Sequence, residues 1–230
     1  MSSLRVLGLD TATWTAAVGV VDDDRVLAEL AEPTPRSHVG VLPRLVESVL
    51  ARAGLGWGDV DGLAVSIGPG SFTGLRIGLA FAKGVAYAGK LPIAAVPTLE
   101  ALAAGVDAGP GTTIWAVLDA RMREVYAASF TRTTGGLARR TPDEALAPDA
   151  MAARLDASCV VVGDAVDAYP VLGTAGARVL RLETHPPRGG VVARLGAARL
   201  RRGEAADVGS LEPAYVRASQ AELAQQRPSR

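Results

Sequence analysis

The chain has 230 residues, enough for one large domain or two small lobes whose core needs no disulfide or metal. Basic and acidic residues both number 24, so the net charge of zero excludes a general field that would hold nucleic acid or an anionic membrane. The single cysteine, Cys159, excludes an intrachain disulfide; with no signal peptide and no apolar run of 18 residues, we expect a soluble cytoplasmic protein.

The first half of the chain alternates short apolar runs with longer periodic segments. The runs and their turn residues predict three antiparallel strands, then a helix capped by Ser37, a strand, a second helix and a further strand. Their ranges are 4–9, 16–21, 25–30, 37–53, 63–67, 71–88 and 91–96.

The second half repeats this order in a shorter form. Its predicted strands and helices lie at 113–118, 124–130, 148–155, 159–162, 178–182 and 191–202. Strands followed by alternating strands and helices in both halves indicate an α/β protein with weak internal duplication. We expect an N-terminal lobe over 1–97, a C-terminal lobe over 98–218 and a flexible polar tail over 219–230.

The strongest local signal is the segment 66–74, SIGPGSFTG, in which a strand ends at a glycine turn and opens into a helix. Free N–H groups at such a turn can bind an anion. Its spacing fits neither a P-loop nor a dinucleotide fingerprint. A phosphate site built from Asp10, Thr11, Gly68 and Gly70 is therefore at most a vestige, and the simpler interpretation is that Asp10 and Thr11 bond their own turn.

Small residues recur at every fourth position along the second helix, at Gly70, Gly74, Gly78, Ala82 and Ala86. Each interior glycine costs about 1 kcal/mol relative to alanine, so the stripe indicates that another backbone approaches closely. That backbone can belong to the chain's own sheet or to another subunit, and the sequence leaves both open. Leu75, Leu79 and Lys83 lie on a separate side of the helix.

Residues suited to catalysis are sparse. His38 and His185 are the only histidines, and Leu42 stands where a helical metal pair would need a second histidine. Cys159 lies in an apolar run, and no Gly-x-Ser-x-Gly nucleophile elbow is present. The sequence therefore predicts no catalytic residue and no metal site.

Several segments together resemble one family, the TsaB-type (YeaZ) proteins of bacterial tRNA threonylcarbamoyladenosine biosynthesis. They span nearly the whole chain and read LDTAT at 9–13, SIGPGSFTGLRIG at 66–78, AKG at 82–84, VPTLE at 96–100, LDAR at 118–121 and EPAYVR at 212–217. The GPGSFTGLR string is highly specific. The resemblance implies a duplicated two-lobed fold of the actin/Hsp70/sugar-kinase (ASKHA) type.

The resemblance also implies a non-catalytic subunit. Such a subunit pairs with a similar catalytic subunit, TsaD, and acts with the ATPase TsaE to transfer a threonylcarbamoyl group to the adenosine beside the tRNA anticodon. We expect no cofactor on the isolated chain, a nucleotide only at the complex interface, tRNA contact only through the complex, and a homodimer when the partner is absent. The metal motif of the catalytic partner is His-x-x-x-His. Here only its first histidine, His38, is present, because Leu42 stands where the second would be.

In that family the partner interface lies on the two helices of the first lobe, which map to 37–53 and 71–89. We predict that the contact surface comprises Leu42, Leu45, Val49, Gly74, Leu75, Gly78, Leu79, Ala82 and Lys83. A bulky residue at Gly78 should then weaken pairing. The alternatives are two enzymes of the same superfamily, an ATP-dependent phosphotransferase and a metallopeptidase.

Overall fold

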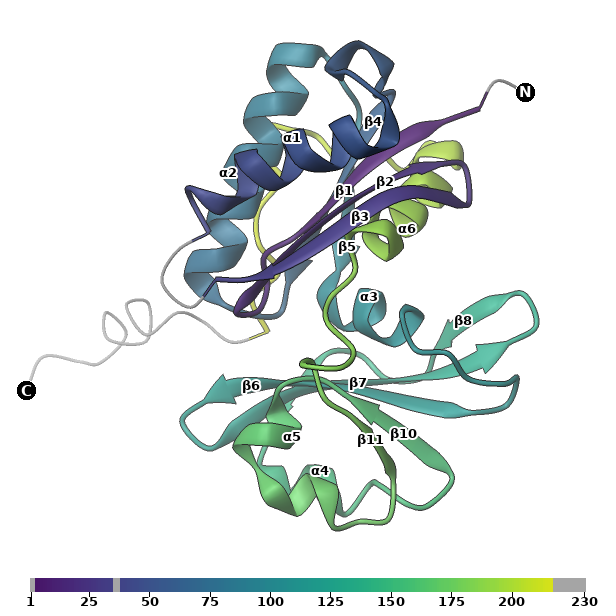
Figure 1. The fold of residues 1–230 in the computed structure, drawn as a ribbon. Helices are drawn as coiled ribbons and strands as arrows, with labels where there is room; N and C mark the ends of the chain where they lie inside the picture. Colours follow the sequence, from purple (N-terminus) through teal and green to yellow (C-terminus); the bar gives the residue numbers. More distant parts are fainter. Residues whose placement is uncertain (1–2, 35–37, 217–230) are drawn as a thin grey trace, which may run out of the picture.

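The computed structural model describes residues 3–34 and 38–216, which form two lobes, each built on a mixed β-sheet (Figure 1). The first lobe's elements are β1 (Arg5–Asp10), β2 (Thr15–Asp22), β3 (Arg25–Pro33), α1 (Val41–Ala53), η1 (Trp57–Asp59), β4 (Gly62–Gly68), α2 (Phe72–Gly89) and β5 (Ile93–Pro97). There follow α3 (Thr98–Ala104), β6 (Thr113–Arg121), β7 (Glu124–Thr133), β8 (Gly136–Arg139), β9 (Glu144–Leu146), α4 (Pro148–Ala152), β10 (Cys159–Val162), α5 (Ala165–Ala168), η2 (Pro170–Gly173), β11 (Arg178–Leu180) and α6 (Gly189–Arg201).

The two sheets have the same topology. The first runs β3-β2-β1-β4-β5 and the second β8-β7-β6-β10-β11, with a sixth strand, β9, also paired antiparallel to β7. In each, the first three strands pair antiparallel and the remaining two join in parallel. Equal order and equal strand directions confirm the predicted duplication and the α/β class.

The central strands are apolar on both faces, so helices cover both sides of each sheet. In β1, Leu7 and Leu9 belong to a core with Val46 of α1, whereas Val6 belongs to a core with Ala193 of α6. Successive strand residues point to opposite faces. Helices α1 and α2 therefore cover one face of the first sheet and α6 covers the other.

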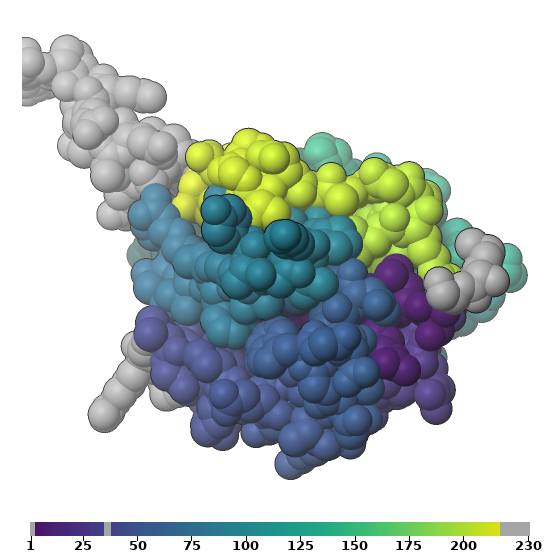
Figure 2. Space-filling model, turned by 90° about the horizontal axis from the view of Figure 1, so that it is seen from above, coloured from purple at the N-terminus to yellow at the C-terminus, as the bar shows by residue number. Residues whose placement is uncertain are grey.

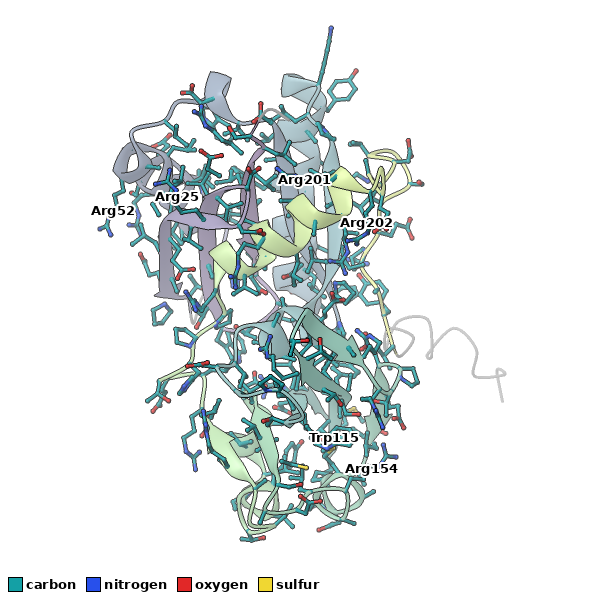
Figure 3. The ribbon with its side chains drawn as sticks, turned by 90° about the vertical axis from the view of Figure 1, so that its right-hand side faces the viewer. Arg25, Arg52, Trp115, Arg154, Arg201 and Arg202 are labelled. Atoms are coloured by element: carbon teal, nitrogen blue, oxygen red, sulfur yellow. The ribbon has the colours of Figure 1, made fainter. Side chains whose placement is uncertain are left out.

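The helix that follows the last strand of each half packs on the opposite lobe. Leu99 and Leu102 of α3 lie in a core with Ile114 and Phe130 of the second sheet. Helix α6 crosses the first sheet, as Figure 3 shows, with Arg201 and Arg202 at its far end. The N-terminal lobe thus includes residues 189–216, which the sequence analysis assigned to the C-terminal lobe. Helix α6 reaches the first sheet only because the two halves pack on each other, and local sequence patterns do not show that packing.

The segment 202–216, termed the strap, runs back along the first lobe after α6. The amide of Ala206 donates to the carbonyl of Ile93 at 2.8 Å, and that of Ala214 donates to the carbonyl of Ile67 at 2.7 Å. Seen from above, the strap (yellow) lies against α2 (teal) in Figure 2. The chain therefore ends its described course beside the start of α2.

The two lobes differ in their helices. Between the equivalent strands, α1 and α2 have 13 and 18 residues, whereas α4 and α5 have 5 and 4. Helix α1 begins at Val41 after Gly40; Ser37 and the predicted tail 219–230 lie outside the described residues. No helix in the described ranges is long and apolar enough to cross a membrane.

Candidate functional site

The glycine stripe of α2 packs against the turn between β1 and β2. The hydroxyl of Thr11 donates to the carbonyl of Gly74 at 2.8 Å, and the amide of Ser71 donates to the carbonyl of Ala12 at 2.7 Å. A side chain at Gly74 or Gly78 would collide with Thr11. Of the two possibilities that the sequence left open, the structure shows close packing within the chain.

Asp10 is held at the base of this turn with both carboxylate oxygens engaged. The Ser66 hydroxyl donates to Oδ2 at 2.6 Å and the Ala12 amide donates to Oδ1 at 2.9 Å. The side chain is buried, and this burial raises the pKa of Asp10 although both hydrogen bonds favour the ionised form. Asp10 bonds its own turn as the simpler interpretation predicted, while Thr11 bonds to α2 instead.

The space that the turn glycines leave is filled by the chain itself. A Cβ at Gly70 would collide with Ala12 of the β1–β2 turn. A Cβ at Gly68 would lie 2.6 Å from the carbonyl oxygen of Ala214 in the strap. These glycines therefore permit a close approach of neighbouring backbone.

The two side chains considered for metal binding or nucleophilic catalysis, His38 and Cys159, are buried. His38 is 4% exposed, its Nε2 has no hydrogen-bond partner among the described residues, and burial lowers the pKa of its imidazole. Burial also raises the pKa of the Cys159 thiol, which disfavours the nucleophilic thiolate. Across residues 3–34 and 38–216, no three His, Cys, Asp or Glu side chains gather as metal ligands.

Most residues predicted to face a partner lie inside the lobe. The buried residues among them are Leu42, Leu45, Val49, Gly74, Leu75, Gly78, Leu79 and Ala82. The Lys83 ammonium donates to the carbonyls of Gly209 and Leu211 in the strap, each at 3.1 Å. The structure thus assigns these residues to the lobe's own packing, which corrects the prediction that they form the contact surface.

A different face of α2 is turned outward. We call it the α2 outer face, and it comprises Thr73, Ile77, Ala80, Gly84 and Tyr87. Its spacing of four and three residues keeps it on one side of the helix, and none of the five is charged. Tyr87 is 84% exposed, and a Cβ at Gly84 would meet open space. The four- and three-residue spacing of these five positions is visible in the sequence, but the stripe of glycines beside them is the more prominent pattern.

An aromatic stack lies beside this face at the start of α2. The Arg76 guanidinium lies 3.8 Å from the centre of the Phe72 ring, whose centre is 5.4 Å from that of Tyr215. Arg76 Nε also donates to the Tyr215 hydroxyl at 3.1 Å. In the sequence the EPAYVR motif contributed only to the family resemblance; the structure shows that its tyrosine fastens the strap to α2.

Comparison with known proteins gives the same family from several directions. The model of the tRNA N6-adenosine threonylcarbamoyltransferase family, TsaD, matches residues 29–158. The tRNA threonylcarbamoyladenosine biosynthesis protein TsaB of Escherichia coli K12 is 38% identical over 183 residues, covering 77% of this chain and 79% of that protein. TsaB of Bacillus subtilis 168 is 32% identical over 228 residues, covering 95% and 96%.

Solved structures agree with these relatives. YeaZ from Pseudomonas aeruginosa superposes with a TM-score of 0.78 and 27% identity, covering 94% of this chain and all of that one. Component A of (R)-2-hydroxyglutaryl-CoA dehydratase from Acidaminococcus fermentans, at a TM-score of 0.52 and 11% identity over 86% of this chain and 99% of its own, shares the actin-like ASKHA fold alone. The chain therefore belongs to the TsaB (YeaZ) family of tRNA threonylcarbamoyladenosine biosynthesis proteins, within the wider group that the TsaD model describes.

Proposed function

We propose that this chain is a non-catalytic subunit that pairs through α1 and α2 with a TsaD-type catalytic subunit. With a TsaE-type ATPase, the pair would transfer a threonylcarbamoyl group to the adenosine beside the tRNA anticodon. The uncharged α2 outer face is the observation that carries this proposal. An exposed uncharged helix face of this kind, with a large exposed aromatic side chain, is typical of a surface that another protein covers.

The form of the α2 outer face favours another helix as its partner. Ala80 and Gly84 are small residues that let another helix approach closely. Tyr87 provides a large exposed side chain at one end of the face. The TsaD family match over 29–158 includes both α1 and α2. A subunit built on the same plan would present equivalent helices, so the two pairs can form one four-helix bundle.

The non-catalytic part of the proposal is supported by the state of the candidate groups. Asp10 has one oxygen bonded to Ala12 in its own turn and the other to Ser66 of β4, and Cys159 has a raised pKa. We further propose that the isolated chain binds neither nucleotide nor metal. Calorimetric titration of the isolated chain with magnesium and ATP tests this, since tight binding with turnover would favour the phosphotransferase; a stoichiometric metal ion on the purified chain would favour the metallopeptidase.

The pairing proposal is tested by a substitution that leaves the fold intact. We choose Gly84→Arg on the α2 outer face and Gly173→Arg in η2 as its matched control, because a Cβ meets open space at both positions. We expect Gly84→Arg to weaken binding of the TsaD-type subunit by at least about tenfold, or about 1.4 kcal/mol. Gly173→Arg should bind as the unsubstituted chain does.

Affinity is measured by titrating each purified variant with the TsaD-type subunit of the same organism, and folding is checked by thermal unfolding. Equal affinity for both variants would exclude the α2 outer face as the contact surface. Light scattering of the chain alone and with the partner then separates the homodimer, which we propose uses the same surface, from the heterodimer.

A further inference from the structure

Trp14 stands on a rigid turn where the two lobes face each other. Its side chain is 53% exposed, yet its carbonyl accepts hydrogen bonds from the amide of Thr34 at 2.6 Å and from the hydroxyl of Thr34 at 3.2 Å. The next amide, of Thr15, donates to the Thr13 hydroxyl at 3.2 Å. An aromatic side chain on a backbone fixed in this way loses little conformational entropy when a ligand packs on it.

Trp14 lines two cavities. One, of about 270 Å³, lies between the lobes and is also lined by Ser71 and Phe72. The other, of about 510 Å³, is also lined by Asp167 and Glu183. Both are lined by Trp14, so a planar group in either cavity can contact its side chain.

The opposing lobe presents the turn between β6 and β7, which is equivalent to the turn that carries Trp14. The φ angles of Arg121, Met122 and Arg123 are 63°, 52° and 61°. Residues other than glycine rarely adopt this left-handed backbone conformation. Each such residue costs on the order of 1 kcal/mol, and strain of this kind gathers at functional sites. The turn carries two basic side chains, and Met122 is 64% exposed.

Basic and acidic side chains lie at different places around Trp14. Arg121 lies 5.7 Å from the Trp14 ring centre and pairs with Asp119 at 2.9 Å, and Arg123 is exposed beside it. The second cavity is lined by Glu183, whose carboxylate can accept hydrogen bonds, and by Asp167, which pairs with Arg181. A nucleotide has the matching pattern, since its phosphate is anionic while the exocyclic amine of adenine or cytosine donates hydrogen bonds.

We propose that Trp14, Arg121 and Arg123 bind an unstacked nucleotide of a single-stranded RNA loop, with its base against the indole and its phosphate at the arginines. Stacking of bases on exposed aromatic rings is the usual way in which proteins hold such loops. The inference rests on the proposed function, which supplies tRNA as the substrate. It also makes the RNA contact local, as a chain without net charge requires.

The test uses the full-length chain assembled with its TsaD-type partner and an unmodified tRNA transcript as the probe. Trp14→Ala should weaken tRNA binding by about 5- to 100-fold, while Trp14→Phe keeps a stacking surface and should restore most of the affinity. Trp57→Ala is the matched control, because Trp57 is a similarly exposed tryptophan, at 43%, on η1. Arg123→Gln should reduce the dependence of log K on log salt by about one phosphate contact.

The outcomes separate this inference from the proposed function. Co-purification of the unsubstituted chain with its partner reports on pairing alone, and its failure would contradict the proposed function. If pairing is intact and Trp14→Ala binds the transcript as tightly as the unsubstituted chain, the RNA site is overturned. The RNA site is also overturned if tRNA affinity is unchanged and Trp14→Ala loses only binding of the ATPase. The same conclusion follows if tRNA affinity is unchanged and the variant loses only binding of free AMP used as a competitor.

Discussion

The hydroxyl of Thr11, at the end of β1, donates a buried hydrogen bond to the carbonyl of Gly74 in the first turn of α2, with 2.8 Å between the two oxygens. This bond forms only because α2 lies close enough for its glycines to meet the β1–β2 turn. The same closeness leaves no room for a side chain at Gly74 or Gly78. The glycine stripe is therefore a condition for folding of the N-terminal lobe.

Replacement of Gly78 by valine should destabilise the chain by about 3 kcal/mol or more, since a well-packed core has no space for the added atoms. Gly84→Ala is the control on the same helix, and it should gain up to about 1 kcal/mol from helix propensity. Urea unfolding at equilibrium measures both. A Gly78→Val chain as stable as the original would show that Thr11 can move away. Weaker pairing by such a variant, which the sequence suggested as a test of the interface, would report unfolding instead.

Most of the longer strands and helices could be predicted from the sequence because each carries its own periodicity, whereas the short β8, β9 and α5 were not predicted. The apolar run before Gly68 and the helical spacing after it depend on local residues alone, and the predicted elements up to residue 202 correspond to observed ones. The crossing of α6 onto the first sheet could not be predicted. It depends on contact between two halves that the chain separates by more than a hundred residues, such as that of Val6 with Ala193.

Lys83 fastens the strap to α2 by two hydrogen bonds from its ammonium group. Lys83→Met keeps the apolar stem and removes the donors, so it should cost about 1–2 kcal/mol and expose the strap to exchange. Hydrogen exchange at the amides of Ala206 and Ala214 is the measurement, with faster exchange expected. Lys90→Met, which changes the only other lysine, should leave both amides as they were. Unchanged exchange in Lys83→Met would mean that the backbone bonds alone hold the strap.

The pair Glu100–Arg199 joins α3 to α6, with one guanidinium nitrogen 2.9 Å from each carboxylate oxygen. The side chains are only 22% and 17% exposed, so solvent screens this pair less than one at the surface. A double-mutant cycle with Glu100→Gln and Arg199→Met should give a coupling energy of about 1 kcal/mol. The same cycle on the exposed pair Arg202–Glu204 should give a value near zero. Equal couplings would show that burial adds nothing to the first pair.

The outward face of α2 was harder to predict than the helix itself. Two stripes of small residues run along α2, one through Gly74 and Gly78 and the other through Ala80 and Gly84. Spacing cannot distinguish the stripe that packs inside from the stripe that faces solvent. The apolar leucines beside the first stripe suggested a contact surface, yet burial in the lobe's own core uses the same residue types.

Asp164 is a partly buried carboxyl between the lobes, and the pKa of its side chain is raised from 3.8 to about 6, chiefly by burial and further by the nearby charge of Asp119. A raised pKa means that the folded chain binds more protons than the unfolded chain between pH of about 4 and 6. The contribution of Asp164 to stability is therefore largest at low pH and is lost as the pH rises through about 6.

Asp164→Asn removes this ionisation while its side-chain oxygen can still accept the hydrogen bond that the Asp119 amide now gives to Asp164 at 2.8 Å. Near pH 7 the variant should be more stable than the original by up to about 3 kcal/mol, and near pH 4 the difference should vanish. Urea unfolding of both chains across this range measures the difference, which cancels the titration of every other group. A difference between Asp164→Asn and the original that does not change with pH would mean that Asp164 titrates as it does in the unfolded chain.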